Sequence, residues 1–369
     1  MVFFFPQSLL RQKEDGTQTF VVVTAIFTAM KNIKLSVLDQ TPIRKGSNAN
    51  QSLQETIELA KLADELGYTR YWLSEHHNSQ TLATGSPEVM IARLGAETKN
   101  IRLGSGGMMM PNHSTLRVAE NFRVLEALYP NRIDLGMGRA PGGDRLTAHL
   151  LNPSNTFDPQ HYIQQLRDLQ HLLNDEPLEG ISEAKVKAIP IINTSPDLWI
   201  LTSSGESAII AAHFGMAVSF AQFINPMGGP EAIKLYKEKF QASAELSEPQ
   251  TSVGIFGFCS EDEEKVLQVQ ALMDYRLLSF ERGQFNQQFS YDDIKDEDYD
   301  NQEWQRVLHN RKRMAIGTPE VMKEKIEKIC RDFDTDEVLI STFTDFKEDR
   351  FNSYRLLAKY FDLKNDSVA

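Results

Sequence analysis

The sequence predicts a (β/α)8 barrel, the TIM-barrel class of α/β folds, with insertions after the fourth and the seventh strand. Short apolar segments rich in β-branched residues alternate with segments of helical periodicity, at a spacing of about 30 residues. This alternation is typical of parallel strands joined by right-handed helical crossovers. Eight strands can be placed in this way, which favours a closed barrel over an open, doubly wound sheet. A chain of 369 residues is compatible with one such domain.

Residues 1–30 do not fit this pattern. The apolar run Phe20–Phe27 is too short to span a bilayer. Phe3–Phe5 precedes the basic residues Arg11 and Lys13, which is the wrong order for a secretory signal. We therefore expect residues 1–30 to be a disordered extension, or the native protein to start at Met30, and we expect residues 31–369 to form the barrel domain.

The first half of the chain supplies four strands and three helices. Ile33–Leu38 is a β-branched, apolar run typical of a buried strand. Ser52–Leu66 has apolar residues at helical spacing, and Gly67 ends this helix. The next elements are strand Tyr71–Leu73, helix Pro87–Thr98, strand Ile101–Leu103, helix Thr115–Leu128 and strand Arg132–Leu135.

The second half repeats the alternation and contains the two insertions. Its elements are strand Trp199–Leu201, helix Ser207–His213, strand Ala217–Phe220, helix Pro230–Phe240, strand Ser252–Phe258, helix Glu261–Phe280, strand Glu337–Ser341 and helix Asp349–Tyr360. The first insertion, Arg139–Ser195, contains one amphipathic helix, His161–Leu173. The second, Arg282–Asn310, is polar, and we interpret its acidic run Asp292–Asp300 as a solvated face. Long excursions of this kind in a barrel are active-site loops or disordered segments.

The composition excludes some classes of protein. A formal net charge of −12 leaves no basic surplus to neutralise phosphates, which argues against a non-specific nucleic-acid binder. Cys259 and Cys330 are the two cysteines, and their spacing matches neither a disulfide framework nor a zinc site. We therefore expect a cytoplasmic protein.

The end of the second strand carries Glu75, His76 and His77. Chemistry in a barrel is found at the carboxyl ends of the strands, and histidine can exchange protons near neutral pH. The alternative is one structural and one solvated histidine. A metal site is not expected, because adjacent residues of a strand point to opposite faces.

Two further strand ends suggest a bound ring and a bound phosphate. Gly106 and Gly107 allow close approach to the backbone, and Met108 after them can line a ring or pack in the core. Ser203–Ser207 has hydroxyls and a glycine where a helix begins, which suits a phosphate but also a plain N-cap. Arg139 can add a charged contact there, or be an ordinary surface residue.

Together these stretches resemble the bacterial luciferase-like, flavin-dependent monooxygenases, in particular their single-chain branch with a Glu-His-His strand end. The matches occur in the family's order over roughly residues 33–345. They are Ser74-Glu-His-His-Asn, Leu103-Gly-Ser-Gly-Gly-Met-Met-Met-Pro, Arg117-Val-Ala-Glu-Asn-Phe, Arg132-Ile-Asp-Leu-Gly-Met-Gly-Arg-Ala-Pro-Gly and Ser203-Ser-Gly-Glu-Ser-Ala.

The resemblance implies a barrel that binds reduced FMN at its carboxyl face and uses oxygen on a small organic substrate. It places the flavin phosphate at Ser203, Ser204 and Ser207 with Arg139 nearby, a non-proline cis peptide at Gly106-Gly107 beneath the flavin, and the catalytic histidine at His76 with His77 beside it. It also implies a separate flavin reductase and a homodimer, for which Pro87–Thr98 and Thr115–Leu128 are the candidate helices.

The chain departs from the pattern of the family at two places, and its sequence also fits two alternative functions. Gly138 stands where the family's reactive cysteine lies, and Arg282–Asn310 does not match the lid of the light-emitting subunit, so light emission is not expected. The alternatives are a deazaflavin-dependent oxidoreductase that transfers hydride without oxygen, and a non-catalytic flavin-binding relative.

Overall fold

A computed structural model describes residues 9–12, 18–21, 32–140, 142–155, 158–178 and 186–364. The chain divides into two units, Met1–Asn32 and Ile33–Ala369. In the first unit, β1 (Leu9–Gln12) and β2 (Gln18–Val21) pair antiparallel. The rest of the predicted N-terminal extension lies outside the described residues, so its disorder and the alternative start at Met30 stay predictions.

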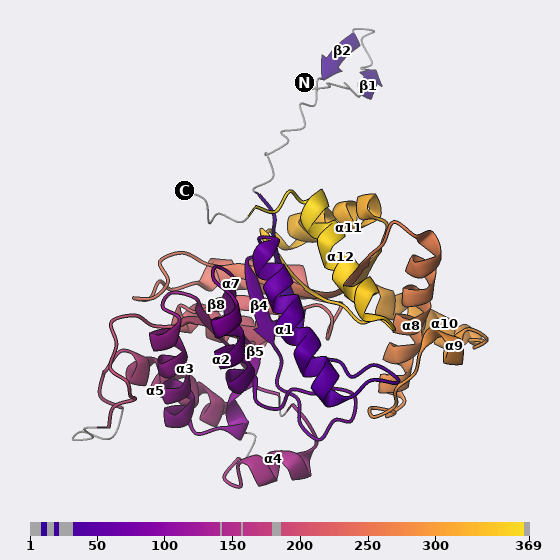
Figure 1. The fold of residues 1–369 in the computed structure, drawn as a ribbon. Coiled ribbons are helices and arrows are strands. Elements are labelled where there is room, and N and C mark those ends of the chain that lie inside the picture. The colour runs from indigo at the N-terminus through magenta and orange to yellow at the C-terminus, as the bar shows by residue number, and fades with distance from the viewer. Residues whose placement is uncertain are drawn as a thin grey trace. The chain divides into compact units, whose positions relative to one another are not determined.

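The second unit is built around a closed barrel of eight parallel strands (Figure 1). The barrel strands are β3 (Lys34–Asp39), β4 (Arg70–Leu73), β5 (Arg102–Met109), β6 (Ile133–Gly138), β7 (Asp197–Thr202), β8 (Ala217–Ala221), β9 (Thr251–Cys259) and β11 (Glu337–Ser341). In the sheet order β9, β11, β3, β4, β5, β6, β7, β8, each strand pairs with the next. The pairing of β8 with β9 closes the sheet. The predicted fold class is confirmed.

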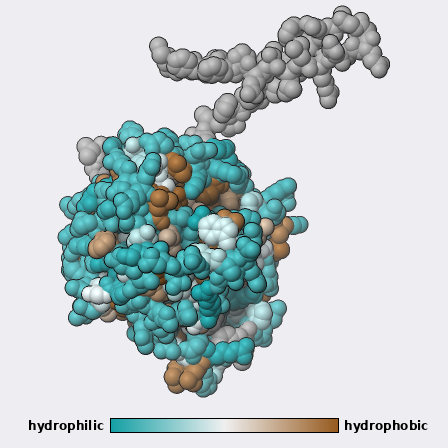
Figure 2. All heavy atoms as spheres, turned by 90° about the vertical axis from the view of Figure 1, so that its right-hand side faces the viewer, coloured by the Kyte–Doolittle hydropathy of each residue, from teal (hydrophilic) through white to brown (hydrophobic). Residues whose placement is uncertain are grey.

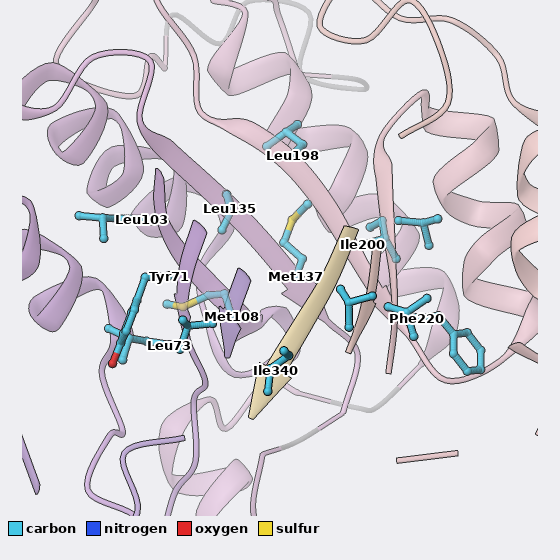
Figure 3. Packing of buried hydrophobic residues seen from close by; sticks show 14 of the residues in the cluster. Tyr71, Leu73, Leu103, Met108, Leu135, Met137, Leu198, Ile200, Phe220 and Ile340 are labelled. Carbon is cyan, nitrogen blue, oxygen red and sulfur yellow. The ribbon is translucent and has the colours of Figure 1, made fainter. Parts of the chain in front are cut away.

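Helices surround the barrel and bury the outer faces of its strands. In Figure 3, Tyr71, Leu103 and Leu135 illustrate this core between sheet and helices. The larger helices are α1 (Ala49–Glu65), α2 (Pro87–Glu97), α3 (Thr115–Leu128), α5 (Pro159–Leu173), α6 (Gly205–Phe214), α7 (Gly229–Lys239), α8 (Glu263–Glu281), α11 (Pro319–Phe333) and α12 (Lys347–Tyr360).

The amino end of the barrel is filled by a buried network of charges. Arg70 contacts Asp134 at 2.8 Å and Glu337 at 2.6 Å, and Trp72 donates to Asp134 at 2.9 Å. The guanidinium of Arg70 also lies 4.5 Å from the ring of Trp199. Every charge in this network has an opposite partner, so the network explains how charged residues can occupy the barrel interior.

Several elements were not predicted. β10 (Met314–Gly317) is four residues long and pairs with the second half of β9, outside the closed ring. The α11 helix follows it in a stretch for which the sequence analysis assigned nothing. The remaining short elements are α4 (Arg145–Leu151), α9 (Tyr291–Ile294), α10 (Asn301–Asn310), η1 (Met110–Asn112) and η2 (Arg311–Arg313). A short strand between a basic run and a proline gives too little periodicity to detect.

The surface on the side of α8, α9 and α10 is mainly hydrophilic, with small groups of hydrophobic residues (Figure 2). None of the helices described is long and apolar enough to cross a membrane.

Cys259 and Cys330 are both buried and free, and burial raises the pKa of each thiol to about 12.

Candidate active site

A buried carboxylate organises the end of β4. Glu75 has no solvent exposure, and its Oε1 lies 2.7 Å from Nε2 of His77 and 2.9 Å from Nε2 of His113. Its Oε2 accepts a hydrogen bond of 2.8 Å from the backbone N–H of Met109 at the end of β5. One carboxylate therefore joins two strand ends and two imidazoles, and His113 enters a site in which the sequence analysis did not place it.

Glu75 and His113 shift each other's pKa. Burial acts to raise the pKa of Glu75, but its hydrogen bonds from His113 and His77 lower that pKa to about 2. Burial acts to lower the pKa of His113, but the hydrogen bond to Glu75 and its charge raise it above the usual value. Glu75 is thus ionised at neutral pH. Within the described ranges, no group of histidine, cysteine and carboxylate residues is arranged to hold a metal ion.

His76 has a different environment from His77. Its Nδ1 shares a hydrogen bond of 3.0 Å with the hydroxyl of Ser74, and its backbone N–H donates to the carbonyl of Thr84 at 3.0 Å. Burial lowers the pKa of His76 to about 4, although the charge of Glu75 opposes this shift. The imidazole is therefore neutral at pH 7. Such a group can accept a proton from a neighbouring reactant.

The peptide bond between Gly106 and Gly107 is cis, as the resemblance implied. Neither glycine has room for a side chain: a Cβ on Gly106 would lie 2.8 Å from Cδ1 of Leu38, and one on Gly107 would lie 2.9 Å from the carbonyl oxygen of Gly136. The pairing of β5 with β6 shifts by one residue here. Close packing around the backbone therefore requires glycine at both positions. The position of Gly106 and Gly107 beneath a flavin stays a prediction.

The side chain of Met108 lies in the core between barrel and helices (Figure 3). It is 1% exposed. Of the two roles that the sequence left open for Met108, core packing is the one that its side chain fulfils, so its position gives no support to a contact with a cofactor.

A cavity of about 360 Å³ lies beside the end of β6. Arg139 and Glu206 line it and form an ion pair of 3.1 Å, in which both side chains are exposed. Tyr162 and Gln165 of α5 also line it. The hydroxyl of Tyr162 and Oε1 of Gln165 are buried, and neither forms a hydrogen bond in the described parts of the chain. The other lining residues are Pro111, Asn155, Asp158, Pro159 and His161.

The three serines lie next to this cavity but do not line it. Ser204 is the N-cap residue of α6, and its side chain makes no capping hydrogen bond. Its backbone N–H instead donates to the hydroxyl of Thr202 at 3.0 Å. Ser207 is buried in the first turn of α6. The plain N-cap role is therefore not observed for Ser204, and the start of α6 keeps polar groups adjacent to Arg139.

Gln165 of the cavity lining is hydrogen-bonded to the segment that carries His113. The side-chain amide of Gln165 donates to the carbonyl of His113 at 3.1 Å and to that of Met110 at 3.0 Å. Tyr162 and Gln165 were not predicted because α5 carries them in a long connection, far from any strand end. A buried polar residue on the apolar face of α5 is the signal that could have found them.

Comparison with known proteins identifies the family. The model of the luciferase-like monooxygenases matches residues 33–335. The chain belongs to the luciferase-like monooxygenase family. It is 43% identical to the uncharacterized protein YwcH of Bacillus subtilis, over 89% of this chain and 99% of that protein. It is 40% identical to the N-acetyl-S-alkylcysteine monooxygenase of Bacillus subtilis, over 57% of this chain and 62% of that protein.

Solved structures of the family have the same fold. Apo-MsnO8 superposes with a TM-score of 0.81 at 32% identity and covers 90% of this chain and 99% of its own. Family membership confirms the enzyme class expected from the sequence, a flavin-dependent monooxygenase. Fold alone does not define the cofactor. An FMN-bound 3,6-diketocamphane monooxygenase at 19% identity and an F420-dependent secondary alcohol dehydrogenase at 12% both share the architecture, with TM-scores of 0.65 and 0.60.

Proposed function

We propose that the protein is an FMN-dependent monooxygenase of the cytoplasm, which receives reduced FMN from a separate reductase and uses oxygen on a small organic substrate. One observation carries the proposal. The neutral imidazole of His76, the closely packed Gly106 and Gly107, and a cavity lined by Arg139 occur toward the carboxyl end of one barrel, the end at which barrel enzymes bind ligands.

The cavity suits the phosphate of FMN. Its buried Tyr162 hydroxyl can donate a hydrogen bond and has no partner among the described residues. The start of α6 adds the N–H groups and the positive dipole end of a helix. Arg139 is held by Glu206, but this ion pair is exposed, and such pairs contribute less than about 1 kcal/mol, so a phosphate can replace the carboxylate at low cost.

The chain would divide the remaining tasks among its own residues. Bound FMN in its reduced form supplies the electrons with which oxygen is activated. His76 would accept or return a proton beside the ring, because its imidazole is neutral at pH 7. Glu75 would keep His77 and His113 in fixed orientations through its hydrogen bonds. The barrel would exclude water from the reaction.

Aerobic turnover with reduced FMN tests this proposal. Oxygen consumption should be coupled to an oxygenated product for at least one compound of a substrate panel, and the absorption spectrum of the bound chromophore should be that of FMN. Binding of a deazaflavin with hydride transfer and no need for oxygen would support the first alternative. Binding of FMN without product formation from any compound would support a non-catalytic flavin-binding protein.

A further inference from the structure

Arg276 of α8 is a guanidinium without an anion. It forms no hydrogen bond and no ion pair within the described ranges, and its Nε is shielded from solvent. Burial lowers the pKa of Arg276 to about 10, although the charge of Asp345 acts in the opposite direction. Asp345 does not pair with it and instead accepts a hydrogen bond of 2.7 Å from the backbone N–H of Tyr291. The side chain as a whole is half-buried, and an external anion would give its cation a partner.

Aromatic rings surround this guanidinium. Its central carbon lies 4.7 Å from the ring centre of Phe343 and 5.7 Å from that of Phe289. The ring of Phe343 contacts Phe256 of β9 at 5.8 Å, and Phe256 contacts Phe223 at 5.5 Å. We call Phe223, Phe256 and Phe343 the aromatic wall. It offers an apolar surface next to a cation.

The aromatic wall lies at the same end of the barrel as His76. Phe223 follows the carboxyl end of β8, and Phe343 follows that of β11. Phe223 also packs against the apolar residues inside the barrel, among them Leu38, which is the residue that excludes a side chain at Gly106. The wall therefore continues from the barrel interior, beside the cis peptide, outward to Arg276.

The segment before α9 connects this region with the loop that carries the histidines. The backbone N–H of Gln80 donates to Asn286 at 3.0 Å, and the side chain of Gln288 donates to the carbonyl of Gln80 at 3.3 Å. Gln80 lies four residues after His76. The segment that contains Phe289 is thus tied by hydrogen bonds to the loop that carries His76, which brings Arg276 and His76 to the same end of the barrel.

We propose that Arg276 binds a carboxylate of the substrate, and that the substrates are small organic acids whose apolar part lies against the aromatic wall. A guanidinium pairs with a carboxylate through two parallel hydrogen bonds, which suits a cation that the protein leaves unpaired. This inference rests on the proposed function for the reaction itself. The binding of the acid is a separate property that can be measured without turnover.

Equilibrium binding of acids and of their matching amides tests whether Arg276 binds a carboxylate. The probes are hexanoate and 4-phenylbutanoate with their primary amides, titrated calorimetrically into the protein with and without saturating oxidised FMN. The wild type should bind each acid more tightly than its amide. In Arg276→Met the acids should bind about 10- to 100-fold more weakly, because this is the usual contribution of a charge-assisted hydrogen bond. The affinity for the amides should not change. Arg282→Met is the matched control, because Arg282 is exposed and pairs with Glu303.

Two further readouts make the result decisive. Arg276→Lys keeps the charge and loses the planar fork, so acids should bind several-fold more weakly even if Arg276→Met does not fold. Equal binding of acids and amides by the wild type, or unaltered acid binding by both variants, would refute the carboxylate site at Arg276. Acid binding without FMN-dependent turnover would support the carboxylate site at Arg276 and refute the proposed function. Turnover of neutral compounds without acid binding would support the proposed function and refute the carboxylate site.

Discussion

The two histidines that follow β4 differ because their side chains meet different partners. His77 is held by the ionised Glu75, whereas the half-buried His76 lies beside the neutral hydroxyl of Ser74. The proposed proton exchange therefore belongs to His76, whereas His77 is proposed to support the site in an orientation fixed by Glu75. The carboxylate also extends the site to His113, which lies 38 positions further along the chain.

Replacing His76 should remove proton exchange while leaving cofactor binding intact. We expect His76→Ala to lower turnover by about 10²- to 10⁴-fold, the usual contribution of a general acid or base, with an unchanged Kd for FMN. Because the pKa of His76 is about 4, kcat/KM of the wild type should stay level from pH 8 to pH 6 and fall only as the pH approaches 4. The exposed His213 provides the control variant His213→Ala. Unchanged turnover in His76→Ala would exclude His76 from the mechanism.

The same residue should make stability depend on pH. The folded state holds the pKa of His76 near 4, below its ordinary value of 6.5, so the unfolded state binds more protons between these two values. The free energy of unfolding should therefore fall as the pH drops from 6.5 to 4, and this loss should be smaller in His76→Ala. Urea titrations at pH 7, 6 and 5 measure it. Parallel curves for both proteins would contradict the shifted pKa.

The phosphate assignment is tested at the start of α6. We expect Ser204→Ala combined with Ser207→Ala to weaken FMN binding by about 100-fold, because each of the two lost hydrogen bonds to a charged group contributes about 1.5 kcal/mol. Ser247, which is exposed, supplies the control Ser247→Ala. Fluorescence quenching of FMN on binding gives the Kd. Unaltered FMN affinity in the double variant would contradict the assignment of the phosphate to these serines.

At the scale of the elements, the amino end of the barrel is held together by charges. The amino ends of β4, β6 and β11 share the buried network of Arg70, Asp134 and Glu337, in which charges satisfy one another. Buried polar groups without partners among the described residues occur beside this network, as at Nε1 of Trp199, and on the outer helices, as at the Tyr162 hydroxyl and Nε of Arg276. Satisfied polar groups stabilise the fold, and a ligand is one of the ways in which an unsatisfied group gains a partner.

Asp134 should be essential for stability and have no role in chemistry. It accepts hydrogen bonds from Arg70, Trp72 and Arg102. Asp134→Ala leaves buried cations without this partner, and we expect a loss of about 3–5 kcal/mol in the free energy of unfolding. The exposed Asp292 provides the control: Asp292→Ala should change stability by less than about 0.5 kcal/mol. Urea denaturation measures both, and equal losses would contradict the structural role of the network.

At the scale of the whole molecule, helices α2 and α3 present apolar side chains to solvent. Val89 on α2 and Val124 and Leu128 on α3 are 65%, 46% and 57% exposed. Val124 and Leu128 are four residues apart and therefore lie on one face of α3. Exposed apolar residues that cluster on adjacent helices are typical of an interface, so we propose that these helices form the two-fold contact of a homodimer.

A charged double substitution tests the dimer. Val124→Glu with Leu128→Glu should convert a dimer to a monomer in sedimentation equilibrium, because two carboxylates would be buried across the interface. Leu267 on α8 is 69% exposed, and Leu267→Glu should leave the dimer intact. A wild-type protein that is monomeric at micromolar concentration, or a double variant that remains dimeric, would refute this contact.

Much of the fold could be predicted from local patterns of apolar residues in the sequence. The predicted helix Thr115–Leu128 has the bounds of α3, and all eight barrel strands lie where alternation placed them, because apolar periodicity reports burial directly. β10 was missed because a four-residue strand has almost no period. α11 was missed although its buried residues Met322, Ile326, Cys330 and Phe333 recur at helical spacing. β5 extends to Met109, beyond its predicted end, because glycines in a strand have no side chain to signal burial.

The sequence by itself determined the barrel and the identity of the strand-end residues, because both depend on neighbours along the chain, whereas the cis peptide was expected from the resemblance to the family. Only the tertiary structure decided which of these residues meet. It joined Glu75 to His113, placed Gln165 and Tyr162 beside Arg139, and put the side chain of Met108 in the core. It also left Arg276 without an anion. Hydrogen bonds and burial depend on distances between segments far apart in sequence, and no local pattern encodes those distances.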